Sequence, residues 1–216
     1  MILPADDFLA AWLGTPFLCW GVGPFLVLNI SFWMSVALIE GVKFFTFASK
    51  IHRSSTSPTM EERLKCEPPL REQLLGSFMT TMGPVAIANV FLLAKIGPWL
   101  IPGPYPTSLS FATLAMECTK FFGLIILKDS MYYFTHRMAH GCEFLYKHVH
   151  SHHHKIHTPR AIGTGYMYMA DATLLEGLPC IASVAIIQPH PLTFYVFLWS
   201  RTAESVSTHS GINCDS

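Results

Sequence analysis

Residues 16–38 read PFLCWGVGPFLVLNISFWMSVAL and contain no charged side chain. A membrane-spanning helix needs about 20 consecutive, mostly apolar residues, so this stretch is long enough to cross a bilayer once. The composition of the whole chain agrees, because 51% of its residues are hydrophobic and 13% are charged, against about 25% charged residues in a soluble domain. The sequence therefore predicts an all-α, polytopic integral membrane protein.

Two further apolar runs follow the first within residues 16–127. One covers residues 76–101 and the other covers residues 108–127. The second of these is apolar except for Glu117 and Lys120, which are three residues apart and can pair on one helix face. We expect three transmembrane spans in this part of the chain.

A last apolar region covers residues 173–200 and is interrupted by the sequence QPHP at residues 188–191. Two prolines so close together break a helix, so this region is expected to form a re-entrant hairpin of two short segments. The fold is then one membrane domain over residues 1–216, whose residues 128–216 carry a histidine-rich helical cap.

The loop between residues 50 and 71 decides the expected orientation. It carries five basic residues, whereas the N-terminus carries Asp6 and Asp7 and the connection at 102–107 is uncharged. Loops rich in lysine and arginine stay in the cytosol. Counting crossings from this loop places the histidine cap on the cytosolic face, and a hairpin at 173–200 leaves His209 on the same face.

Several classes of function are excluded by simple counts. The formal net charge is zero and no long basic tract exists, so nucleic acid is not an expected partner. The six cysteines show no CxxC spacing, which favours reduced thiols. The N-terminus lacks the basic start of a secretory signal, so the first apolar run is interpreted as a retained span.

Eight of the eleven histidines fall between His136 and His157. At about 100° per residue on a helix, Asp129, His136 and His140 lie on one face with Tyr133 beside them. In the next segment His150, His153, His154 and His157 share a face, whereas His148 and His152 point away. Spacings of three and four residues let imidazoles converge on one ion, so the pattern predicts a metal site.

Other interpretations of the histidines stay open at this point. HRMAH alone is also compatible with a surface helix, and a solvated histidine-rich tract explains the local composition. Imidazole binds zinc, copper, iron and nickel, but a zinc site needs only three or four ligands. The larger number of candidates favours two irons.

The stretches KDSMYYFTHRMAH (128–140), LYKHVHSHHHKIHTP (145–159) and THSG (208–211) resemble the fatty acid hydroxylase and sterol desaturase superfamily of membrane di-iron oxygenases. The closest resemblance is to 4-methyl sterol monooxygenases. Shared features are an Asp seven residues before an HRxxH box, a following Tyr, an HxxHH box and a Pro five residues beyond it. In this sequence these are Asp129, Tyr146, the two boxes and Pro159.

The resemblance implies six iron ligands, namely His136, His140, His150, His153, His154 and His209. Glu176 lies where the family commonly has a glutamate after the second box. Asp129 and Tyr133, from their positions on the helix face, are candidates to orient the histidine rings, with ordinary helix packing or an interfacial aromatic as the alternative. By resemblance, a multi-pass protein of the endoplasmic reticulum would use O2, and electrons from NAD(P)H through a b-type cytochrome or reductase, to hydroxylate or oxidise a sterol or fatty-acyl lipid.

Two features depart from the family pattern. Residues 171–175 read DATLL and lack the family's usual histidine before Glu176. A third histidine box is missing before Ser216, so residues 128–216 are expected to be a truncated catalytic region. The alternative function is a catalytically incomplete relative that acts as a membrane scaffold or regulatory subunit, with a zinc enzyme as a third candidate.

Overall fold

The computed structural model of the chain describes residues 5–46, 65, 67–103, 105, 110–158 and 160–212. Pro159 and most of the basic loop at 50–71, with the orientation argument that rests on it, lie outside this part. The regular elements of the described residues are all helical, as the sequence predicts. In order they are α1 (Ala5–Gly14), η1 (Phe17–Val22), α2 (Gly23–Thr46), α4 (Leu70–Met82), α5 (Pro84–Leu100), α6 (Phe111–Gly141), α7 (Glu143–Leu145), η2 (Tyr146–His150), η3 (His153–Lys155), η4 (Ala161–Gly165), α8 (Met169–Asp171), η5 (Ala172–Gly177), α9 (Leu178–Ile187) and α10 (Pro191–Thr208).

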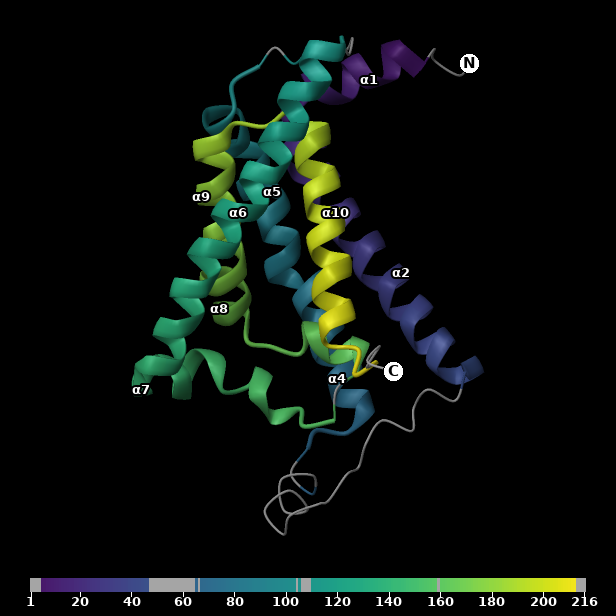
Figure 1. Cartoon of the computed structure of the whole chain (residues 1–216), viewed down its shortest axis with the longest axis vertical. Coiled ribbons are helices and arrows are strands. Elements are labelled where there is room, and N and C mark those ends of the chain that lie inside the picture. Colours follow the sequence, from purple (N-terminus) through teal and green to yellow (C-terminus); the bar gives the residue numbers. More distant parts are fainter. Residues whose placement is uncertain are drawn as a thin grey trace.

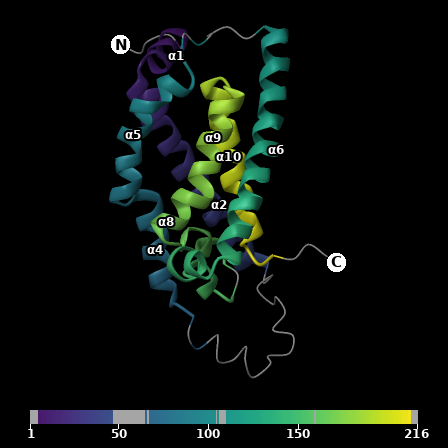
Figure 2. The ribbon, with the colours of Figure 1, turned by 90° about the vertical axis from the view of Figure 1, so that its left-hand side faces the viewer.

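The long helices form an elongated bundle whose two ends differ (Figure 1). α1, the start of α6 and the connection between α9 and α10 lie at one end. α4, α7 and the C-terminal end of α10 lie at the other end, together with the short helices η2, η3 and η4 (Figure 2). The short helices form the histidine-rich helical cap that the sequence predicts.

Three helical stretches of the described chain are long and apolar enough to cross a membrane: Phe17–Phe44, Leu70–Leu100 and Met169–Ile187. They support a multi-pass membrane protein. The expected spans at 16–38 and 76–101 fall within the first two. The run at 108–127 instead begins α6, which is not one of the three, because its apolar first half carries Glu117 and Lys120 and its second half is polar.

The second of these stretches is bent at Gly83, between α4 and α5. Pro84 begins α5 and has no N–H to donate. A Cβ atom on Gly83 would lie 2.2 Å from the carbonyl oxygen of Met79, so only glycine fits this close approach. The bend therefore follows from the Gly-Pro pair in the sequence.

The hairpin expected over 173–200 is confirmed, with longer arms than the sequence suggests. α9 ends at Ile187, and the next residue, Gln188, has a left-handed φ of 50°. The ring of His190 accepts a hydrogen bond from the backbone N–H of Leu192 at 3.1 Å. Pro191 starts α10 in the first turn, where a missing N–H costs nothing. The two arms return the chain to the end of the bundle where it entered.

A buried carboxylate fastens this hairpin turn to α6. Glu117 accepts hydrogen bonds from the backbone N–H of His190 and from the hydroxyl of Thr193, both at 2.8 Å. Lys120 lies 2.9 Å from the other carboxylate oxygen and also donates to the carbonyl of Gln188 at 2.9 Å. The pairing of Glu117 and Lys120 expected from the sequence is confirmed, and it extends to the turn.

The cap is anchored to the bundle through η4, all five residues of which are buried. Ser77 of α4 donates to the carbonyl of Ile162 at 2.6 Å. Glu40 of α2 accepts from the backbone N–H of Ala161 at 3.1 Å. These bonds from two helices hold the segment that follows the histidine boxes against the bundle.

Candidate metal centre

The last two turns of α6 present the first pair of histidines. His136 and His140 are four residues apart, so they lie on one face of the helix, and their Nε2 atoms are 3.1 Å apart. Tyr132, one turn earlier, packs its ring 5.2 Å from that of His136. The helix ends directly afterwards, at Cys142, whose backbone is extended.

η2 and η3 bring a second pair to the same place. His150 ends η2 and is buried, with 2% of its surface exposed. His154 in η3 lies four residues on, and its Nε2 atom is 2.9 Å from that of His150. The ring centroids of His140 and His154 are 4.8 Å apart, so the two boxes meet.

The two pairs form one cluster of potential ligands. A nitrogen atom from each of His136, His140, His150 and His154 lies within 4.8 Å of the other three. The histidine boxes, separate in the sequence, are therefore brought together as predicted.

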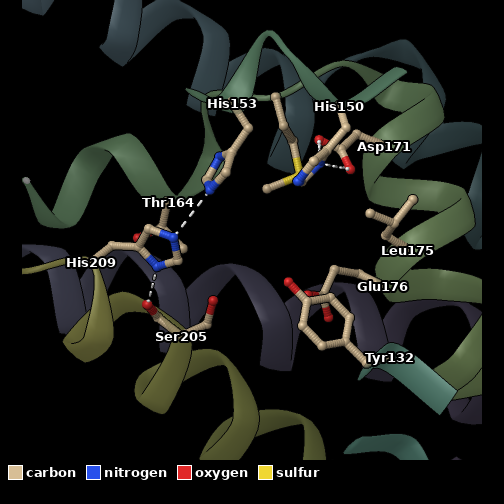
Figure 3. A pocket seen from close by; sticks show the side chains of 10 residues that line it. Tyr132, His150, His153, Thr164, Asp171, Leu175, Glu176, Ser205 and His209 are labelled. Carbon is tan, nitrogen blue, oxygen red and sulfur yellow. Dashed lines mark hydrogen bonds and ion pairs between the residues drawn. The ribbon is translucent and has the colours of Figure 1, made fainter. Parts of the chain in front are cut away.

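His153 and His209 form a further pair beside this cluster (Figure 3). Their Nε2 atoms are 3.1 Å apart, although the residues are 56 positions apart in the sequence. His209 follows the last turn of α10, and its Nδ1–H donates to the carbonyl of Ser205 at 2.8 Å. The α9–α10 hairpin thus leaves His209 at the histidine end, as the hairpin prediction required.

Asp171 orients His150, and the sequence reasoning did not identify this role. Both oxygens of its carboxylate lie 3.1 Å from Nδ1 of His150, and the side chains of both residues are buried. An Nδ1–H bonded to a carboxylate fixes the ring and directs the Nε2 lone pair toward a metal. The signal available in the sequence was a lone carboxylate at the start of an apolar run.

The environment favours neutral imidazoles. Burial, followed by the charges of neighbouring histidines, lowers the pKa of His153 and of His154 to about 4. Burial also lowers the pKa of His136. Neutral rings keep a lone pair free at pH 7, and a neutral imidazole is the form that binds metals.

The other histidines of the segment lie apart from the cluster. The ring of His152 stacks between those of Tyr166 and Tyr168, with centroids 4.3 Å apart in each case. His148 is exposed and packs against Phe144. The helix stops at Ile156, which is extended, so His157 does not continue the face on which a helical reading places it.

The three residues expected around the ligands have different surroundings. Asp129 is paired with Arg201 of α10 at 2.6 Å. Tyr133 is 53% exposed, and its hydroxyl accepts a hydrogen bond from Arg137. Of the two neighbouring tyrosines, Tyr132 rather than Tyr133 reaches a histidine. Glu176 lies beside the cluster, where it is paired with Lys128 at 2.8 Å.

A small cavity of about 40 Å³ is lined by His150 of the cluster and by His153 and His209. Figure 3 shows Tyr132 and Glu176 on the wall that faces His153 and His209. The lining residues are Tyr132, His150, His153, Thr164, Met167, Asp171, Leu175, Glu176, Ser205 and His209. A space of this size holds one or two water-sized molecules.

The donor set fits a metal. Four rings whose nitrogens converge cannot all satisfy one another by hydrogen bonds, whereas one cation would engage all four nitrogens. Two of the six candidate ligands, His150 and His209, also have their other ring nitrogen engaged by an oxygen acceptor. That arrangement is typical of histidines that ligate metals.

Comparison with known proteins points to the same part of the chain. Residues 121–216 match the sequence profile of the family described as fatty acid hydroxylase. Sphinganine C4-monooxygenase 1 of Arabidopsis thaliana is 34% identical over 103 residues, which are 48% of this chain and 38% of that protein. The very-long-chain aldehyde decarbonylase GL1-8 of Oryza sativa subsp. indica is 37% identical over 86 residues, which are 40% of this chain and 31% of that protein.

A longer match extends toward the N-terminus. The very-long-chain aldehyde decarbonylase GL1-10 of Oryza sativa subsp. japonica is 25% identical over 153 residues, or 71% of this chain and 46% of that protein. The chain thus spans less than half the length of each of these three relatives. No solved structure matches the chain significantly. The superfamily resemblance is confirmed, but none of these three relatives is named for a sterol.

Proposed function

We propose, on the premise that residues 121–216 belong to the fatty acid hydroxylase family, that this chain is a membrane oxidoreductase that uses O2 to hydroxylate or oxidise a lipid. The ligands of a di-iron centre would be His136, His140, His150, His153, His154 and His209. A sphinganine monooxygenase among the relatives supports this reaction class.

The convergence of four imidazole nitrogens within 4.8 Å carries the proposal. Among the described residues, the histidines of α6, η2 and η3 face one another and not a shared hydrogen-bond donor, and a cation between them would explain the arrangement. The His153–His209 pair lies beside this cluster and lines the small cavity together with His150, so a second iron would find its first two ligands there. The iron dependence of the family favours iron over zinc.

When bound, the irons would supply the activation of O2 and the oxidation of a C–H bond. The chain's own residues set the ligand geometry. Asp171 accepts the Nδ1–H of His150, and the carbonyl of Ser205 accepts the Nδ1–H of His209. The Nε2 atom of His150 therefore faces His154, and that of His209 faces His153. Leu175 and Met167 supply apolar walls that limit the access of water.

The named substrates of the relatives favour a long-chain lipid over a 4-methyl sterol as the substrate. One relative is named for sphinganine and the other for very-long-chain aldehydes, and neither name refers to a sterol. A bilayer around the apolar helices would deliver either substrate class. We further propose a location in the endoplasmic reticulum, a cap that faces the cytosol, and electrons from NAD(P)H through a b-type cytochrome or its reductase.

Metal content of the purified full chain in detergent tests the proposal. Elemental analysis would be run on the wild type, on a variant with His136, His150 and His153 changed to alanine, and on His148→Ala as a control. His148 is exposed and lies outside the cluster, so its loss should leave the metal content unchanged. The expected result is iron in the wild type and in the control, but not in the triple variant.

Measuring turnover of candidate substrates by the purified chain distinguishes a long-chain lipid from a sterol as the substrate. The iron-loaded chain would be supplied with NAD(P)H, a reductase and a b-type cytochrome, together with sphinganine, a very-long-chain aldehyde or a 4-methyl sterol. O2-dependent conversion of one of them assigns the substrate class. A folded wild type that binds no iron would contradict the proposal and favour a scaffold or regulatory subunit.

A further inference from the structure

A buried lysine lies next to the candidate metal centre and has no role in the ligand set. Lys128 of α6 is 6% exposed, and its Nζ atom lies 4.5 Å from the centre of the Tyr132 ring. A lysine ammonium held away from water is costly unless it is paired. Its partner is the carboxylate of Glu176, at 2.8 Å.

Glu176 reaches this position from η5, a π-helical turn. π-Helical turns are rare and occur often at functional sites. Asp171, the residue directly before this turn, and Glu176 both line the cavity. The two carboxylates have different partners, because Asp171 is bonded to the ring of His150 and Glu176 to the ammonium of Lys128.

An unpaired Glu176 would compete with the histidines. Carboxylate oxygens bind transition metals readily, and a cavity of about 40 Å³ brings its lining groups close together. The side chain of Glu176 is 41% exposed, so protein packing alone does not immobilise it. The contact that restrains the carboxylate is the ion pair with Lys128.

We infer that Lys128 is a positioning residue that holds the Glu176 carboxylate away from the metals and so keeps one coordination position open. Catalytic metal sites need such an open position for substrate. This inference rests on the proposed function, since it presumes that a metal occupies the histidine cluster. In this inference the ion pair of Lys128 and Glu176 acts as a unit, because Lys128 restrains the carboxylate that Glu176 supplies.

Cobalt substitution tests the inference without any turnover. The purified full chain in detergent would be loaded with Co2+ alone, and its visible absorption band recorded, because the intensity of that band depends on coordination number and geometry. In Lys128→Met the freed carboxylate joins the ions, and the band weakens by about twofold or more as the coordination number rises. Lys128→Met/Glu176→Gln should restore the wild-type band, because an amide is a poor ligand.

Two controls exclude a general effect of losing a lysine or changing Glu176. Lys120→Met removes a partly buried lysine from the same helix, and its band should match the wild type. Glu176→Gln alone should also leave the band unchanged, because Glu176 is not a ligand in the native arrangement. If Lys128→Met fails to fold, Lys128→Gln replaces it.

The outcomes separate this inference from the proposed function. A wild type that binds no Co2+ contradicts the metal centre itself. A wild-type band that persists in the folded Lys128 variants, or one that changes in Glu176→Gln, overturns the positioning role while leaving the metal centre intact. A band that weakens in the single Lys128 variant and recovers in the double variant supports it.

Discussion

The two ends of the helical bundle both concentrate polar side chains, but only one end satisfies them within the chain. At the hairpin end, each oxygen of Glu117 has a donor, and Lys120 has two acceptors. At the histidine end, the Nδ1 atoms of His136 and His153 are buried without a hydrogen-bond partner in the described part of the chain. At this end the Nε2 atoms of His136 and His140 also face each other, as do those of His150 and His154.

The difference shows how a structural polar group can be distinguished from a binding site. Buried polar groups that serve only the fold find partners in the chain, as Glu117 does. Ring nitrogens that converge on one point cannot all find partners among themselves, so the arrangement is that of a site for a ligand.

The largest effect is expected from His150→Ala. Binding free energies of roughly 10–16 kcal/mol are typical of four-ligand metal sites, so loss of one of four ligands removes about 3 kcal/mol or more and weakens metal binding more than about 100-fold. Competition with a chromophoric chelator measures the affinity. An affinity within about threefold of the wild type would remove His150 from the ligand set.

At the opposite end, Glu117→Gln should destabilise the fold without removing a ligand. Its side chain is 8% exposed, and breaking a buried pair costs about 3 kcal/mol. The thermal unfolding midpoint in detergent should fall, whereas metal binding by the folded variant persists. Glu117→Met/Lys120→Met should recover most of the stability, because no charge is left unpaired. Lost metal binding in folded Glu117→Gln would contradict the separation of the two ends.

Asp171→Asn tests the residue that orients a ligand. Loss of a carboxylate partner of a metal-binding histidine typically costs about 10–100-fold in affinity, and we expect that range here. Asp129→Asn is the matched control, because Asp129 is paired with Arg201 and touches no ligand. Equal affinities of the two variants would show that the contact between Asp171 and His150 is not used in metal binding.

The smallest effect concerns pH and the metal-free chain. Burial lowers the pKa of His153 and of His154 to about 4, whereas the unfolded chain keeps the ordinary value of about 6.5. The stability from neutral rings is therefore fully present above pH 6.5 and is lost as pH falls toward 4, because the unfolded chain takes up protons first.

Thermal unfolding of metal-free protein between about pH 7.5 and pH 5 measures this dependence. The midpoint should fall with pH in the wild type and in His148→Ala. The fall should be smaller in His153→Asn/His154→Asn, which lacks both titrating rings. A midpoint independent of pH over this interval would contradict the burial of neutral histidines.

Local patterns were sufficient for much of the fold. Length and hydropathy were enough to predict two spans and a hairpin. The features that determine them act on adjacent residues: the apolar run at 16–38, the Gly-Pro pair at 83–84 and the QPHP interruption at 188–191. The run at 108–127 illustrates the limit, because α6 continues as one helix to Gly141 and is not apolar enough to be a candidate span. The composition of the run at 108–127 shows where the chain is apolar. The length of α6 depends instead on how far its backbone hydrogen bonds continue.

The site shows the same division. Spacing of four residues on a helix was enough to pair His136 with His140 and His150 with His154, because those contacts lie within one turn. Tyr132 rather than Tyr133 reaches the cluster, since the rotation of α6 against its neighbours decides which face points inward. The partners of Asp129 and Glu176 belong to other helices, so no spacing within their own segments could reveal them.

The amino-acid sequence was sufficient to indicate the helical membrane class, the two histidine pairs and the resemblance of residues 121–216 to the fatty acid hydroxylase family, because each rests on short-range periodicity or local identity. The packing of the helices was needed to show that Asp171 contacts His150, that His153 meets His209 and that Lys128 pairs with Glu176. Those contacts join residues 21 to 56 positions apart. Their distances depend on how separate helices pack, which no local pattern encodes.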